Sequence, residues 1–139
     1  MQQLLKSFLS TRAVSSTSGS FGLLILRIGF ALLMMTHGFA KMSNFTTMSA
    51  TFDPIGLGGG FSLSLVIFAE VFCSIGLLVG LLTRAATIPL IINMLVAVLV
   101  AHGGDPLAAK EMGLLYLIVY VAILFTGPGK FSVDRYIWK

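Results

Sequence analysis

Five ionisable residues lie inside or at the ends of long apolar runs, where a charge is costly to keep. They are Arg27, His37, Lys41, Glu70 and His102. Within a bilayer such a side chain costs about 2.5–3.5 kcal/mol on insertion scales, and it usually faces a bundle interior or water. Histidine titrates near neutral pH, so it can donate, accept or pass a proton. We therefore take these five residues as a candidate polar site within a membrane.

Helical geometry relates these side chains to one another. At 100° per residue, Arg27, His37 and Lys41 fall within about 80° of one helix face. If each apolar run is centred on the midplane, Glu70 lies about 2 Å towards the outside, Arg27 about 7 Å towards the cytoplasm and His37 about 8 Å towards the outside. Glu70 is thus predicted between two basic groups, and His102 is expected to close the outer rim.

Three interpretations of the charges remain open from the sequence. Arg27 snorkels to the cytoplasmic headgroups, or Arg27 and Glu70 form a purely architectural pair, or the charges belong to a functional site that opens outward. Three further residues are expected as secondary lining: Asn93, on the face of its helix opposite to His102, and Tyr116 and Tyr120, one turn apart.

The sequence gives little support for a bound metal or haem. Two histidines, His37 and His102, without an attachment motif are weak evidence for haem, and with Glu70 they make a sparse metal set. No metal site is predicted, and the cofactor is left unknown. Cys73 is the single cysteine, which excludes a thiol–disulfide relay carried by this chain alone.

The elements that position these residues are membrane-spanning helices. Of the 139 residues, 57% are hydrophobic and only 10% charged, whereas a soluble domain has about a quarter charged residues. Apolar runs at about 21–42, 61–82, 85–101 and 111–127 are each near the length that spans a bilayer. The sequence predicts an all-α integral membrane four-helix bundle over residues 21–127. The net charge of +4 comes from singly scattered residues, so no nucleic-acid partner is expected.

The remaining segments are short. Residues 1–20 are expected to be cytoplasmic and to hold an amphipathic helix on the membrane surface, and residues 128–139 a basic cytoplasmic tail. The connection 43–60 is a structured excursion or a partly re-entrant loop, and the brief connection at Thr83–Arg84 forces an antiparallel hairpin. Lysine and arginine counts place both termini in the cytoplasm. One side carries Lys6, Arg12, Arg84, Lys130, Arg135 and Lys139, and the other Lys41 and Lys110.

Several of these motifs together resemble the DoxX family. They are the runs Leu26–Phe30 and Thr36–Met42, then Glu70, Gly76, Leu77, Gly80, Thr83–Ala86 and His102, and finally Gly127–Asp134. Each is weak alone, but their order and spacing extend over about residues 23–135. The resemblance implies a multi-pass protein of the bacterial or archaeal inner membrane.

The function implied by the resemblance is less specific than the fold. DoxX relatives include a subunit associated with thiosulfate:quinone oxidoreductase, and others are linked to oxidative and thiol stress. The first hypothesis is thus a redox accessory that binds quinone or docks an oxidoreductase, at most a subunit of an enzyme. The second is a non-enzymatic module that binds or moves a lipid or small hydrophobic molecule, or scaffolds a complex. Expected partners are the bilayer, an oxidoreductase subunit or a second copy of the chain.

Overall fold

Four long apolar helices make up most of the protein. A computed structural model describes residues 1–9, 14 and 16–138. The spans are α2 (Thr17–Ser43), a second built from α4 (Gly59–Ile67), η1 (Phe68–Cys73) and α5 (Ser74–Val79), a third from α6 (Thr83–Val96) and η2 (Ala97–Ala101), and α7 (Leu107–Thr126). Each is long and apolar enough to cross a membrane. The predicted all-helical bundle with four membrane spans is confirmed, and the described residues contain no strand.

The first span begins earlier than the sequence predicts because its serines take part in helix contacts. The Ser16 side chain caps α2 by accepting a hydrogen bond from the Gly19 N–H at 3.1 Å. Ser20 is fully buried, and its hydroxyl accepts a hydrogen bond from the Lys130 N–H at 3.1 Å. The polar residues Thr17, Ser18 and Ser20 therefore belong to the first turn of the helix. The fourth span similarly begins at Leu107, one turn before Glu111.

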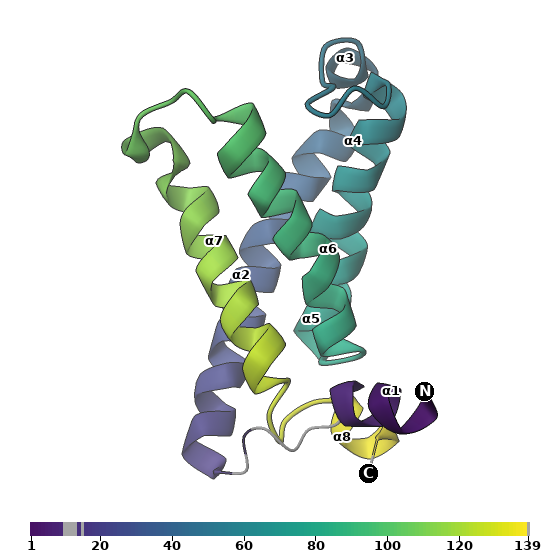
Figure 1. Ribbon diagram of the computed structural model, residues 1–139, viewed down its shortest axis with the longest axis vertical. Coiled ribbons are helices and arrows are strands. Elements are labelled where there is room, and N and C mark those ends of the chain that lie inside the picture. Colours follow the sequence, from purple (N-terminus) through teal and green to yellow (C-terminus); the bar gives the residue numbers. More distant parts are fainter. Residues whose placement is uncertain (10–13, 15, 139) are drawn as a thin grey trace.

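Both termini lie at the same end of the bundle, which we call the termini end (Figure 1). There α1 (Gln2–Leu9) and the short α8 (Asp134–Ile137) lie below the spans. Arg84 holds α1 in place, since its Nη1 donates to the Phe8 carbonyl and its guanidinium lies 5.9 Å from the centre of the Phe8 ring. The cytoplasmic location of this end remains a prediction, and Arg12 and Lys139, two of its supporting charges, lie outside the described residues.

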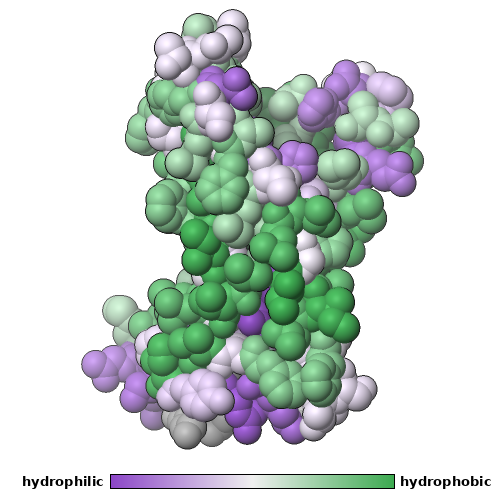
Figure 2. Space-filling model, turned by 180° about the vertical axis from the view of Figure 1, so that it is seen from behind, coloured by the Kyte–Doolittle hydropathy of each residue, from purple (hydrophilic) through white to green (hydrophobic). Residues whose placement is uncertain are grey.

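The opposite end, which we call the loop end, carries α3 (Phe45–Ser49) in the first connection. Phe45, Met48 and Phe52 pack against a small core of Leu63, Ile67 and Val71. The connection is therefore a structured excursion that covers the second span. On the face that Figure 2 shows, hydrophobic side chains cover most of the middle of the molecule, and polar side chains gather at both ends.

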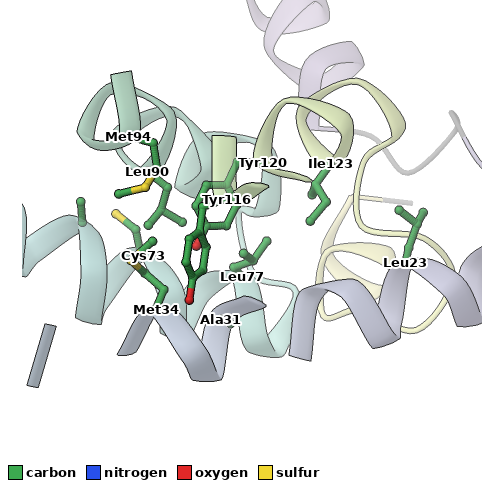
Figure 3. Packing of buried hydrophobic residues seen from close by; sticks show 11 residues of the cluster. Leu23, Ala31, Met34, Cys73, Leu77, Leu90, Met94, Tyr116, Tyr120 and Ile123 are labelled. Atoms are coloured by element: carbon green, nitrogen blue, oxygen red, sulfur yellow. The ribbon is translucent and has the colours of Figure 1, made fainter. Parts of the chain in front are cut away.

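The main core lies between all four spans. Tyr116 and Tyr120 lie at its centre, with Met34, Cys73 and Met94 on one side and Ile123 on the other (Figure 3). Tyr120 and Ile123 have no exposed surface. This core fixes the relative positions of the helices that carry the candidate site.

Candidate functional site

A polar cavity of about 240 Å³ lies at the loop end between the four spans. Figure 2 shows this end divided into two lobes with a hollow between them. The polar lining comes from α2, η1, the connection after η2 and α7, and consists of His37, Lys41, Glu70, His102 and Lys110. The apolar lining consists of Met34, Met94, Ala97, Val98, Ala109, Met112 and Gly113. We call this space the polar cavity.

Glu70 is the most enclosed polar group of the cavity, with 3% of its surface exposed. One carboxylate oxygen, Oε2, accepts a hydrogen bond from Lys41 Nζ at 2.7 Å, and Oε1 accepts one from Asn93 Nδ2 at 3.0 Å. The ion pair and the amide together tie the first, second and third spans through one carboxylate. Lys41 retains 20% of its side-chain surface exposed, so it still has donors that face the cavity.

Local backbone irregularities lie on both sides of the polar cavity. Glu70 lies within the π-helical turn η1, and the π-helical turn η2 ends directly before His102. Single π-turns inside α-helices occur frequently at functional sites. Gly38 allows α2 to approach η1 closely, because a Cβ there would lie 2.6 Å from Val71 Cγ2 and 2.9 Å from Glu70 Cβ. This approach brings Lys41 within reach of Glu70.

The two histidines differ in their partners. The His102 Nδ1 lies 2.8 Å from a carboxylate oxygen of Asp105, an exposed pair in the connection to α7. The His37 ring packs edge-on against Tyr116 at a centroid distance of 6.1 Å, and it has no hydrogen-bond partner among the described residues. Both nitrogens of His37 are therefore available to a molecule in the cavity.

The charge of the lining is not balanced. Lys41 and Glu70 compensate each other, and Lys110, whose Nζ donates to the Gly103 carbonyl at 3.1 Å, adds a positive charge. With neutral histidines the lining carries an excess of one positive charge. It thus favours a ligand with electron-rich oxygens over a free cation, and no cluster of three or more His, Cys, Asp or Glu residues suited to a metal occurs in the described parts of the chain.

The structure places Arg27 apart from the polar cavity. Its guanidinium is 1% exposed and donates to four backbone carbonyls, those of Leu77, Leu78, Pro128 and Phe131, at 2.7–3.2 Å. We call this group the arginine cluster. Arg27 is buried and does not extend to the molecular surface, and it does not pair with Glu70. The expectation that it faces Glu70 is corrected, because backbone carbonyls of the second span and of the C-terminal segment take up the donors of Arg27.

The secondary candidates divide in the same way. Asn93 bridges to a neighbouring helix, as anticipated, and its partner is Glu70. Tyr116 and Tyr120 are buried in the core and do not line the cavity. Together with Arg27, they hold the bundle rather than form the cavity wall.

Two polar residues escaped the sequence reasoning. Lys110 entered the sequence analysis only in the count of basic residues on each side of the membrane. Its position one turn into the fourth span could have indicated that it faces the same end as His102. Asp134 lies in the C-terminal motif, and its carboxylate accepts hydrogen bonds from the N–H groups of Leu82 and Thr83 at 2.6 and 2.8 Å. It thereby caps the start of α6 from the far end of the chain. Nothing in local spacing indicates such a contact.

A four-span helical membrane protein with a polar cavity at one end is the class that this fold and site define. The chain belongs to the DoxX family, whose model matches residues 22–103. It is 25% identical over 122 residues to the inner membrane protein YqjF of Escherichia coli, covering 85% of this chain and 93% of that protein. An uncharacterized protein of Haemophilus influenzae is 30% identical over 129 residues, covering 84% and 91% of the two chains.

A third relative is an uncharacterized membrane protein of Mycobacterium tuberculosis, 27% identical over 137 residues, covering 87% of this chain and 84% of that protein. No solved structure matches the chain. The similarity to these proteins extends over 84–87% of this chain and 84–93% of theirs.

Proposed function

We propose that this DoxX protein is a multi-pass protein of the bacterial inner membrane that binds a quinone headgroup in the polar cavity and serves as the membrane accessory of an oxidoreductase. The observation that carries the proposal is the convergence of donors and one acceptor around one partly open cavity. His37, Lys41, Glu70, His102 and Lys110 come from all parts of the bundle and line one volume of about 240 Å³.

The chemistry of this lining suits a quinone better than a simple cation. A quinone presents two carbonyl oxygens at opposite ends of a flat ring, and both accept hydrogen bonds. Lys41 and His37 lie on the α2 side of the cavity, and Lys110 and His102 lie on the side of α6 and α7. Donors on two walls can therefore bind both carbonyls at once. The excess positive charge stabilises electron density on the ring oxygens.

The acceptor in the cavity has a separate role. Reduction of a quinone to a quinol takes up two electrons and two protons, and the quinol hydroxyls then need acceptors. Glu70 offers a carboxylate, and neutral His37 offers a ring nitrogen. The partner oxidoreductase supplies the two electrons, and the two protons enter from water at the mouth of the cavity. This chain supplies the binding site and the hydrogen-bond acceptors for the quinol hydroxyls.

The test uses the full chain in lipid nanodiscs and duroquinone, a quinone without a tail, as the probe. We expect saturable binding that weakens by about three- to tenfold in His37→Ala and in Lys110→Met, the effect of one lost hydrogen bond to the ligand. Thr36→Ala is the matched control for His37→Ala, because Thr36 is exposed and its hydroxyl bonds within its own helix. Wild-type protein that does not bind duroquinone would refute the proposal.

A second candidate function is that of a non-enzymatic lipid-binding module, and one observation favours it. A groove of about 300 Å³, which we call the lipid-side groove, lies between the second and third spans and is almost wholly apolar. Its lining is Pro54, Ile55, Ser62, Leu65, Val66, Phe68, Ala69, Pro89, Ile92, Asn93 and Val96. Native mass spectrometry from mild detergent would distinguish the two functions, since this one requires a retained phospholipid.

A further inference from the structure

We propose that the polar cavity and the lipid-side groove are two parts of one site, which binds an amphiphile with its head in the cavity and its hydrocarbon tail in the groove. This inference rests on the proposed function for the head and adds the class of ligand, a quinone that carries a tail. It also assigns the boundary between the two parts to the hydrogen bond between Asn93 and Glu70.

The two spaces are lined by consecutive residues of the same helices. In η1, Phe68 and Ala69 line the groove, and the next residue, Glu70, lines the polar cavity. In the third span, Val96 lines the groove and Ala97 the cavity. The groove and the cavity therefore lie on the two sides of one helix–helix seam.

The side chains of Asn93 and Glu70 meet across this seam. Asn93 lines the groove, and its Nδ2 donates at 3.0 Å to Oε1 of Glu70, which lines the cavity. The other polar side chain of the groove, Ser62, is engaged with Asp53, to which its hydroxyl donates at 2.9 Å. Asn93 is thus the one polar feature that marks the inner end of an apolar groove, and it marks the end next to the cavity.

The location of the groove determines what kind of group it accepts. Leu65 and Ile92 on its two rims are 44% and 56% exposed, and both belong to helices that are long and apolar enough to cross a membrane. Since lipid tails are as apolar as these side chains, hydrophobic burial gives little preference for any one chain. Selectivity comes instead from the polar pair of Asn93 and Glu70 beside the groove. It favours a hydrocarbon tail whose polar headgroup binds Glu70 and the neighbouring residues of the cavity.

The test compares two quinones in nanodiscs: duroquinone, which has no tail, and decylubiquinone, which carries a decyl tail. Bulky substitutions in the groove are used to block the tail sterically. Leu65→Trp fills the groove from the second span, and Ile92→Trp fills it from the third. Leu32→Trp is the matched control, because Leu32 is 49% exposed on α2 and lines neither space. We expect both groove variants to bind decylubiquinone at least about tenfold more weakly than wild type. Duroquinone binding should remain within about twofold.

The outcomes separate the two proposals. If the groove variants match Leu32→Trp for both quinones, the tail lies elsewhere and this inference fails, while the proposed function stands. If they lose both quinones equally, the groove does not discriminate tails and the inference fails as well. If wild-type protein binds neither quinone, the proposed function fails, and a phospholipid retained in wild type and displaced in Leu65→Trp would assign the groove to the lipid-binding module.

Discussion

The arginine cluster and the polar cavity both keep charged groups at membrane depth, yet they satisfy them differently. In the arginine cluster one guanidinium is 1% exposed and every bond goes to a backbone carbonyl. In the polar cavity Lys41 is 20% exposed on its side chain, and His37 has no hydrogen-bond partner in the described chain. Four of the five N–H groups of this buried guanidinium already donate to backbone carbonyls. It therefore offers little to a ligand, so the cost of a buried charge does not by itself identify a functional site.

The largest expected effect comes from Arg27→Met. It leaves four carbonyls without their donor at the termini end, and we expect the free energy of unfolding to fall by at least about 3 kcal/mol. Thermal or denaturant unfolding in mixed micelles, followed by circular dichroism, measures this. Duroquinone affinity of the folded fraction should stay within about twofold of wild type. Arg135→Met, at an exposed position, is the control. If Arg27→Met were stable but had lost affinity, Arg27 would belong to the binding site and not to the structural framework.

Gly38→Ala should affect both stability and binding. The added Cβ would lie 2.6 Å from Val71 Cγ2, and overpacking of this kind costs about 1–3 kcal/mol. Because the clash also displaces Glu70, duroquinone binding should weaken several-fold. Gly22→Ala is the matched control on the same helix, since a Cβ there meets nothing within 4 Å. Equal behaviour of the two variants would show that the close approach of α2 to η1 is unimportant.

The ion pair in the polar cavity should have a smaller effect on stability than the arginine cluster. Lys41→Met leaves the buried Glu70 carboxylate with Asn93 as its remaining donor, and we expect a loss of about 1–2 kcal/mol. Glu70→Gln in the same chain should recover most of that loss, because the unpaired charge is then removed. A double-mutant cycle from unfolding curves measures the coupling. Additive losses would mean that the two residues do not interact.

The smallest expected effect is on the connection between the first and second spans. This connection belongs neither to the arginine cluster nor to the polar cavity. Hydrogen bonds from the Ser62 hydroxyl and from the N–H groups of Gly58 and Leu57 hold the pKa of Asp53 below its ordinary value. A carboxyl whose pKa is lowered on folding stabilises the fold above its unfolded pKa, near 3.9. That stability is lost as the pH falls further, through the folded value.

We therefore expect faster proteolysis of residues 51–58 at about pH 3 than at pH 6, measured with an acid-active protease. Asp53→Asn should remove most of the pH dependence, with Asp105→Asn as the control in the other connection. If cleavage rates do not change with pH in wild type, the carboxylate does not order this loop.

The four spans could be predicted because hydropathy and length alone determine them. The hydrogen bond between Lys41 and Glu70 was not predicted, although the sequence did place Lys41 on the face of the first span that turns towards Glu70. The partners of Arg27 did not follow, because its acceptors are backbone carbonyls, which no sequence pattern marks. The estimated depths already separate Arg27 from Glu70 by about 9 Å. Ten residues along a helix separate Arg27 from His37, which is about 15 Å. Its acceptors also lie partly in the C-terminal segment, at separations of 101 and 104 residues.

The position of Glu70 was less predictable in detail. The π-helical turn η1 changes the direction of its side chain relative to a regular helix, and the sequence carries no clear signal for that turn. Lys110 lines the cavity because the connection between η2 and α7 turns the start of α7 towards it. The spacing of residues in the sequence does not determine the path of that connection. These are consequences of tertiary packing.

The arginine cluster also sets an order of events during synthesis. Arg27 enters the membrane with the first span, whereas the carbonyls of Pro128 and Phe131 are made about a hundred residues later. At roughly 5–20 residues per second, that delay is about 5–20 seconds. Until then the guanidinium lacks two acceptors and can be accommodated by reaching towards the headgroups. The bundle therefore closes last at the end where it began, and a chain that stops before Pro128 retains an unsatisfied charge in its first span.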